Sequence, residues 1–233
     1  MFSSIRKTLV LTLALGLSLG LAASCGKKKN GDATKADGKA DDKADDKTAK
    51  AGDSPCTEKN QLEFTPVEGD GLKLETPFQT KMGTGYISGM RYNNKALAKL
   101  GYVAIGNYDV ALGPYGIDMP KDPKEVAVLI SFKTKSEDVE FEKQEELYKT
   151  LKVPTGEYAK PGWMDPEQIF QVNYFVGGKN GGPALTGTNA KGKANLTVAT
   201  PEWICGSIDL TSEKGSTVKG TFAVKVAKDF WAK

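Results

Sequence analysis

Residues 204–226 read ICGSIDLTSEKGSTVKGTFAVKV, and this stretch decides the fold. In residues 218–226, Val218, Gly220, Phe222, Val224 and Val226 occupy every second position, which is the period of a strand that buries one face. Residues 204–210 form a second apolar run, and the segment between the two runs contains Gly215, which suits a tight turn. The stretch therefore predicts a C-terminal β-hairpin whose second strand is half buried.

The same alternation recurs upstream, between turns rich in glycine, proline and asparagine. In the clearest case, Val126, Val128, Ile130 and Phe132 fall on one face and are predicted to point inward. Further strands are predicted at 102–108, 126–132, 169–176 and 194–199, with weaker candidates at 62–64, 72–75 and 86–90.

Helices are predicted at only two places, residues 138–151 and, more briefly, residues 94–100. Seven or eight short strands with glycine-rich connections indicate a mainly β protein. We therefore expect a single antiparallel β-sandwich, or a barrel-like domain, with one or two short helices over residues 56–233.

The N-terminus has the three regions of a secretory signal peptide. Arg6 and Lys7 supply positive charge, residues 8–23 are predominantly apolar, and the small residue Ser24 precedes Cys25. An apolar run of about 16 residues is shorter than the ~20 that a transmembrane helix needs, although such a helix is the alternative. We expect residues 1–24 to be removed as a signal peptide.

Leu21-Ala22-Ala23-Ser24-Cys25 resembles the lipobox of bacterial lipoproteins. The family more often has leucine three residues before the cysteine, where this chain has Ala22. The resemblance implies that Cys25 receives fatty acyl chains such as palmitate and becomes the N-terminus, so that membrane lipid is its first partner. Gly26 stands where some lipoproteins carry an inner-membrane retention aspartate, which favours the outer membrane. The resemblance implies no activity for the folded domain.

After the lipidated cysteine, residues 25–55 form a low-complexity segment. Residues 26–55 contain eight lysines, seven aspartates and, apart from one proline, no apolar side chain larger than alanine. Such a segment cannot bury enough surface to offset the entropy of ordering it. We expect a disordered tether spanning ~30 Å.

Cys56 and Cys205 remain once Cys25 is modified. In an exported chain, two such cysteines predict a disulfide bond, with two buried thiols as the alternative. Closing a loop of about 150 residues would contribute about 4–5 kcal/mol by the chain-entropy model.

The absence of histidine excludes several kinds of site. The chain has none, so Ser-His-Asp and Cys-His nucleophiles and His-ligated zinc are impossible.

A net charge of only +3 argues against nucleic acid as a partner. The acidic residues between 137 and 146 are predicted to form a solvated helix face, and a phosphate-loop-like stretch at 187–193 continues as a strand. No cofactor, metal site or catalytic residue is predicted, and the chain is not expected to be an enzyme.

Two aromatic residues in loops are the candidate binding residues. Tyr115 lies in Gly-Pro-Tyr-Gly, and Trp163 lies in Pro-Gly-Trp-Met, where it could instead fold back onto the core. We therefore expect an envelope lipoprotein whose β domain binds a protein or ligand partner. The alternatives are a carrier of a small apolar ligand with a barrel-like cavity and, less favoured, a carboxylate-based hydrolase.

Overall fold

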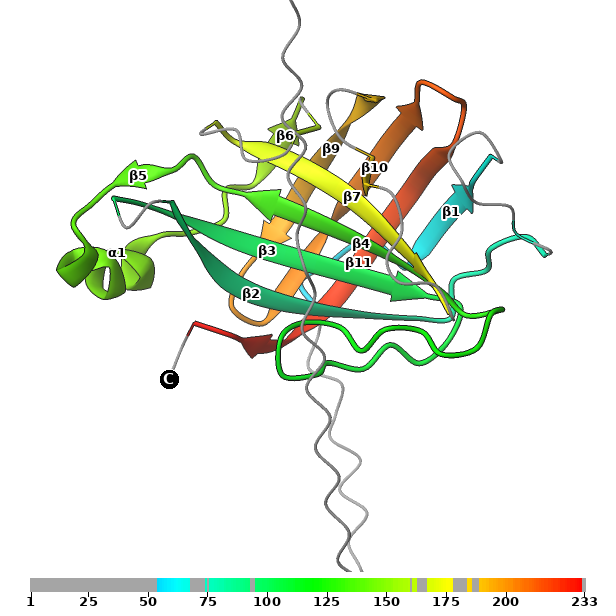
Figure 1. Ribbon diagram of the computed structural model, residues 1–233, viewed down its shortest axis with the longest axis horizontal. Helices are drawn as coiled ribbons and strands as arrows, with labels where there is room; N and C mark the ends of the chain where they lie inside the picture. The colour runs from blue at the N-terminus through cyan, green and yellow to red at the C-terminus, as the bar shows by residue number, and fades with distance from the viewer. Residues whose placement is uncertain are drawn as a thin grey trace, which may run out of the picture. The chain divides into compact units, whose positions relative to one another are not determined.

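The computed structural model of the chain describes residues 54–67, 74, 76–92, 95–159, 161–162, 167–177, 184–185 and 189–231. They form a mainly β domain (Figure 1). The strands are β1 (Gln61–Thr65), β2 (Met82–Tyr92), β3 (Ala96–Gly106), β4 (Val126–Lys133), β5 (Glu137–Asp138), β6 (Gly156–Tyr158), β7 (Ile169–Val176), β8 (Ala184–Leu185), β9 (Ala190–Ala199), β10 (Trp203–Ser212) and β11 (Thr217–Asp229). A 3-10 helix, Phe141–Lys143, leads into α1, Gln144–Thr150. Neither helix of the described ranges is long and apolar enough to cross a membrane.

The strands form one open sheet in the order β6-β9-β10-β11-β2-β3-β4-β7-β8, with β1 added to β11 and β5 added to β3. Strand β11 belongs to both halves of this sheet. Its first part pairs with β10 and β1, and its last residues, 226–229, pair with β2. Consequently β2, β3, β4 and β7 form a layer in front of β9, β10 and β11, as in a sandwich (Figure 1). The predicted sandwich class is confirmed, although the β11–β2 pair is parallel.

The core lies between these two layers. Val126, Val128, Ile130 and Phe132 point into it, as the alternation of β4 predicts. The opposite layer supplies the apolar face of the C-terminal hairpin, and the Phe222 ring lies 5.7 Å from the Phe132 ring. Each fully buried side chain of this size contributes about 1.5–3 kcal/mol from removal of apolar surface from water. The core is therefore the main source of stability.

A second cluster holds Trp231, just after β11, against β2 and α1. The Trp231 ring stacks on Tyr148 of α1 at 5.0 Å, and the Arg91 guanidinium lies 4.3 Å from the Trp231 ring centre. The Tyr148 hydroxyl donates a hydrogen bond to Asp229 over 2.8 Å. A Cβ atom on Gly89 would collide with the Trp231 ring, so a larger residue there would have to displace the indole. These contacts join α1, β2 and the end of β11.

Three predicted elements differ from the structure. Residues 96–100, predicted as part of a short helix, belong to β3, because they complete an eleven-residue ladder with β2. The helix predicted at 138–151 is shorter, since residues 137–138 pair with β3 as β5. Of the weak strand at 72–75, only Leu74 is described, outside any strand. The predicted C-terminal hairpin, β10–β11, is confirmed.

The predicted disulfide bond joins Cys56 to Cys205, with 5.8 Å between their Cα atoms. Cys56 precedes β1, and Cys205 is buried in β10. Between Cys56 and β1, Asn60 accepts a hydrogen bond from the Ala223 amide over 2.8 Å. The bond therefore fastens the start of the domain to the strand pair β10–β11.

Candidate binding surfaces

The connection between β3 and β4, residues 107–125, covers one end of the outer face of the front layer. Its apolar residues Val110, Leu112 and Ile117 pack on a cluster that includes Tyr86 and Tyr102. The two tyrosine rings are stacked, with centres 4.3 Å apart. This connection is therefore a packed part of the domain, held by its own apolar contacts.

Within this connection, residues 111–118 form a small hairpin. Leu112 and Ile117 form an antiparallel bridge, and the Gly113 amide donates to the Gly116 carbonyl over 2.8 Å. Gly116 has a φ of +144°, which an L residue adopts only with strain. The Asp118 amide donates to a backbone carbonyl on the opposite arm over 2.9 Å. The turn at the tip is therefore fixed on both sides.

Tyr115 occupies the tip of this hairpin, where 97% of its surface is exposed. Met119, on the same connection, is 53% exposed. An aromatic side chain on a preformed turn can contact a partner with little loss of conformational entropy. The structure thus presents Tyr115 as a side chain available for recognition.

The other predicted site residues are Trp163, Cys25 and the two disulfide cysteines. Trp163 and Cys25 lie outside the described residues. Cys56 and Cys205 form the disulfide bond described above. Of the two predicted binding residues, Tyr115 is therefore the one that the structure describes.

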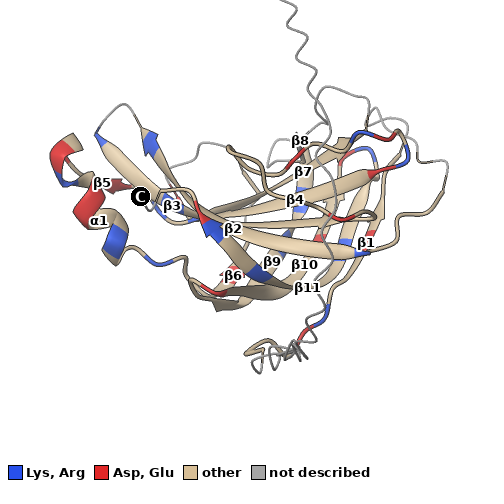
Figure 2. Cartoon of the chain, turned by 90° about the horizontal axis from the view of Figure 1, so that it is seen from below, with Lys and Arg blue, Asp and Glu red and all other residues tan. Residues whose placement is uncertain are grey.

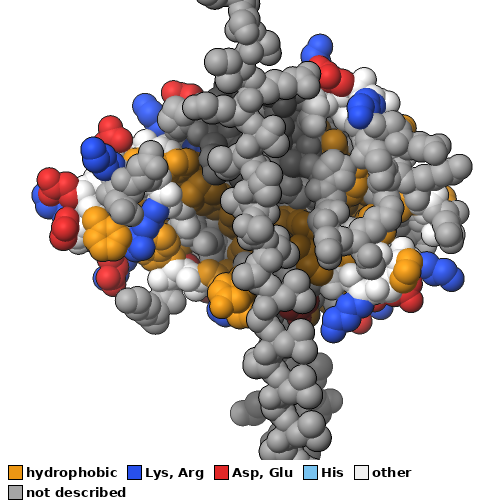
Figure 3. Space-filling view, viewed as in Figure 1, with side chains coloured by type: hydrophobic (Ala, Val, Ile, Leu, Met, Phe, Trp, Pro, Cys, Tyr) orange, Lys and Arg blue, Asp and Glu red, His pale blue; other side chains and the backbone are white. Residues whose placement is uncertain are grey.

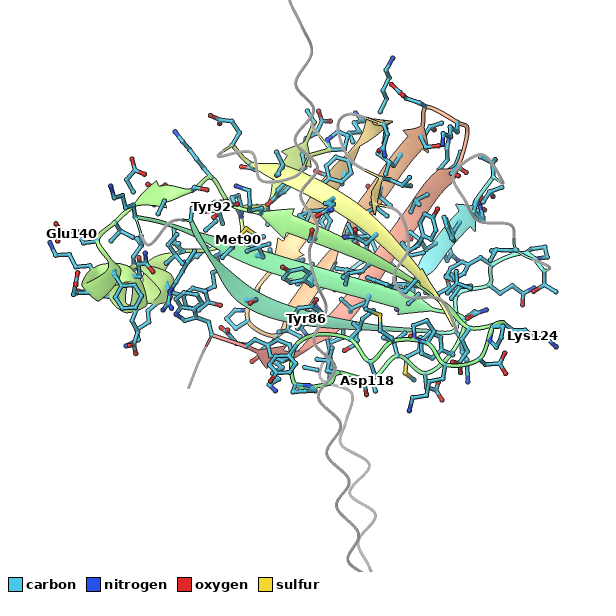
Figure 4. The ribbon with its side chains drawn as sticks, viewed as in Figure 1. Tyr86, Met90, Tyr92, Asp118, Lys124 and Glu140 are labelled. Carbon is cyan, nitrogen blue, oxygen red and sulfur yellow. A yellow bond between two sulfur atoms is a disulfide. The ribbon has the colours of Figure 1, made fainter. Side chains whose placement is uncertain are left out.

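A second candidate surface lies at the other end of the same face. Figure 3 shows hydrophobic side chains over the middle of the front layer and charged residues at its left and right edges. Met90 lies well away from Asp118 and Lys124 of the covering connection (Figure 4). Near Met90 is a pocket of about 100 Å³, here called the outer-face pocket. Its described lining residues are Met90, Leu100, Tyr102, Ser131, Lys133, Gly162, Ile169, Phe170, Gln171 and Asn173.

The register of the strands places the polar residues of this pocket side by side. Ser131 lies opposite Tyr102 on one side and Gln171 on the other. The Gln171 amide donates to the Asn173 side chain over 3.3 Å. Burial, and to a smaller extent Tyr92, raises the pKa of Tyr102 to about 12, so its hydroxyl is neutral at ordinary pH. The pocket wall thus carries a hydroxyl, two amides and a phenol.

Lys133 is the buried cation of this pocket, with only 4% of the residue exposed. Its ammonium donates to the Thr134 carbonyl over 3.1 Å and to the Ser136 hydroxyl over 3.3 Å. It also lies 5.5 Å from the ring centre of Tyr92. Lysine is rarely this buried, because removing its charge from water is costly. The fold therefore maintains a cation at an outward position of β4.

The acidic residues between 137 and 146 do not form a pocket of this kind. They are exposed on β5, the 3-10 helix and α1, where lysines are interspersed with them (Figure 2). Lys149 and Glu145, for example, approach to 3.8 Å on α1. No group of three or more metal-ligating side chains occurs among the described residues. This surface has the charge pattern of a solvated helix face.

A wider groove of about 760 Å³ lies between Pro55 and the β9–β10 turn. It is open, and its polar side chains Thr200, Glu202 and Lys225 are exposed. By contrast, the outer-face pocket encloses polar groups that the fold has removed from water. The smaller pocket is distinguished by the buried polar side chains Ser131, Lys133 and Gln171 in its lining.

The outer-face pocket was not found from the sequence. Ser131 and Lys133 alternate with the inward residues of β4, and polar residues at such positions normally indicate a solvated face. Only the three-dimensional arrangement shows that they are buried. Comparisons with models of protein families, with characterised proteins and with solved structures found no match to this chain.

Proposed function

We propose that this chain is a lipid-anchored protein of a bacterial envelope whose β domain is a binding module that recognises a partner through Tyr115. The observation that carries the binding role is the fixed hairpin with Tyr115 97% exposed at its tip. Large aromatic side chains are frequent binding hot spots. A preformed turn reduces the entropy lost on binding.

The anchoring part of the proposal depends on the N-terminal sequence. Cys25 follows a signal peptide and the lipobox-like residues 21–24, and a polar segment separates it from the β domain. Gly26, in place of a retention aspartate, favours the outer membrane. Mass spectrometry of the mature protein should find an acylated Cys25 as the first residue. A Cys25→Ala variant that still fractionates with membranes would contradict anchoring.

The binding role is tested by photo-crosslinking in intact cells. A photoreactive phenylalanine analogue at position 115 should give one dominant adduct. The matched control is the same analogue at Phe141, which is 51% exposed on the 3-10 helix, away from the hairpin. A Tyr115→Ser variant of the natural chain, used as competitor, should not reduce the adduct, whereas the natural chain should.

Two outcomes would contradict the proposal. Equal adduct patterns at positions 115 and 141 would show that the hairpin has no selectivity. Equal competition by the natural chain and by Tyr115→Ser would show that the tyrosine side chain contributes nothing to binding. Loss of folding does not account for a failure of Tyr115→Ser to compete, because Tyr115 is 97% exposed and makes almost no contact with the rest of the domain.

A further inference from the structure

We infer that residues 88–92 of β2 pair antiparallel with the same residues of a second copy of this chain. The alternation of backbone groups along β2 identifies the edge at which this happens. The Phe230 amide donates to the Ile87 carbonyl, so the backbone groups of Ile87 point away from β3. Because successive residues of a strand point these groups to opposite sides, Gly89 and Arg91 face the same way as Ile87.

Strand β11 covers only part of this edge. It pairs with residues 85–87, whereas β2 continues to Tyr92. Past this pairing, no described residue pairs with β2 on the same side. The Trp231 ring lies against the face of the strand at Gly89, where it stacks on the ring of α1, and not along the edge. The N–H and C=O groups of Gly89 and Arg91 are therefore open to an added strand.

The edge also lacks the features that usually prevent pairing with another chain. Such features are proline, several charges or a very short strand. At the ends of the sheet, β6 and β8 have only three and two residues. Residues 88–92 contain no proline, and their one charged residue is Arg91. Its guanidinium is held 4.9 Å and 4.3 Å from the ring centres of Phe141 and Trp231, so it does not block the edge.

A second copy fits this edge in one register. With Met90 at the centre, Gly89 of each copy lies opposite Arg91 of the other, and each such pair exchanges its hydrogen bonds. With Gly89 at the centre, Arg91 would face Ile87, whose carbonyl already accepts from Phe230. With Arg91 at the centre, two like charges would face each other, which is destabilising. The register on Met90 satisfies every open group and has the two-fold symmetry common in homodimers.

Cysteine crosslinking tests this register. Two residues at a non-hydrogen-bonded position of an antiparallel pair have Cα atoms about 4.5 Å apart, which permits a disulfide bond. Met90→Cys should therefore link two copies through position 90 when oxidised glutathione is added, and mass spectrometry of the linked peptides should identify this bond. The matched control is Ser88→Cys, because Ser88 is half-buried like Met90. It should form almost no linked dimer, since the two positions 88 lie about 14 Å apart in this register.

Sedimentation of the full-length chain tests the edge itself. The paired segment is short, so we expect a weak dimer, with a Kd of about 10–100 μM. Arg91→Pro removes an N–H that faces the second copy and leaves the ladder with β3 intact, so it should weaken the dimer at least about tenfold. The matched control is Arg91→Ala, which loses the same side chain and keeps the N–H. It should dimerise much more strongly than Arg91→Pro.

Three results would overturn the inference. Equal linking by Met90→Cys and Ser88→Cys would show random collision, and a natural chain that stays monomeric at high micromolar concentration would exclude a second copy as the occupant. Equal weakening by Arg91→Pro and Arg91→Ala would show that the edge N–H is not used. If Arg91→Pro does not fold, the two cysteine variants decide. Tyr115→Ser should dimerise as the natural chain does, so failure here is distinct from failure of the proposed binding role.

Discussion

Gln144, the first residue of α1, is fully buried, and neither atom of its side-chain amide has a hydrogen-bond partner among the described residues. A buried amide without partners costs about 1–3 kcal/mol. Methionine has a similar shape and no such requirement. We predict that Gln144→Met raises the free energy of unfolding by about 1–2 kcal/mol, measured by chemical denaturation.

The control for this prediction is Glu145→Gln at the next position, where the side chain is exposed. That change should alter stability by less than about 0.5 kcal/mol. A loss of stability in Gln144→Met would contradict the prediction. It would indicate that a bound water or another ligand satisfies the amide.

At the scale of single residues, the sequence predicted the disulfide pair and the exposed Tyr115, but it did not predict that Lys133 is buried. The number of cysteines was sufficient to pair Cys56 with Cys205, because once Cys25 was set aside as the expected lipidation site only one pair was possible. Tyr115 was found from the turn residues around it. The burial of Lys133 was not predictable, because its position in an alternating strand indicates only which face it occupies.

At the scale of the elements, Gly89 of β2 leaves room for the Trp231 ring, which follows β11. Trp231, just after β11, lies against Gly89 and between Tyr148 and Arg91. A larger side chain at position 89 must displace the indole ring. Such overpacking costs about 1–3 kcal/mol. We predict that Gly89→Val lowers the free energy of unfolding by this amount and changes the tryptophan fluorescence.

Two comparisons isolate this effect. Ser88→Val places the same side chain on the opposite face of β2 and should be nearly neutral, because Ser88 is half-buried away from Trp231. In a Trp231→Ala background, the cost of Gly89→Val should largely disappear, since the colliding ring is absent. An undiminished cost in that background would assign the effect to the backbone rather than to the indole.

The elements were predicted best where one face alone is buried or where turns bound a short apolar run. The bounds of β7 were predicted without error from such a run. The start of β3 was wrong, because alanine, leucine and lysine favour a helix in isolation. There, Leu97 packs on the inner side while Leu100 faces the outer-face pocket, so both faces are buried and the alternation is hidden. Tertiary pairing with β2 overrides the local preference.

For the whole molecule, one strand, β11, joins the two layers, and one covalent bond fixes its neighbours β1 and β10. β11 pairs with strands of both layers, so the domain depends on fixing its neighbours β1 and β10. The Cys56–Cys205 bond closes a loop with a sequence separation of 149 residues. In the chain-entropy model, a loop of this size restricts the unfolded state by about 5 kcal/mol. Reduction should therefore destabilise the entire domain rather than one edge of it.

We predict that the Cys56→Ala/Cys205→Ala variant unfolds with a free energy about 4–5 kcal/mol lower than the oxidised natural chain, measured by urea denaturation. Because Cys205 is buried, part of that loss could come from the missing sulfur atoms rather than from the open loop. The reduced natural chain separates the two causes, since it keeps the sulfur atoms and lacks the bond. If the loop is the cause, the reduced chain and the variant should have nearly equal stabilities, and reductant should not affect the variant. A reduced chain as stable as the oxidised one would show instead that contacts such as Asn60 with Ala223 already hold β1 and β11 together without the bond.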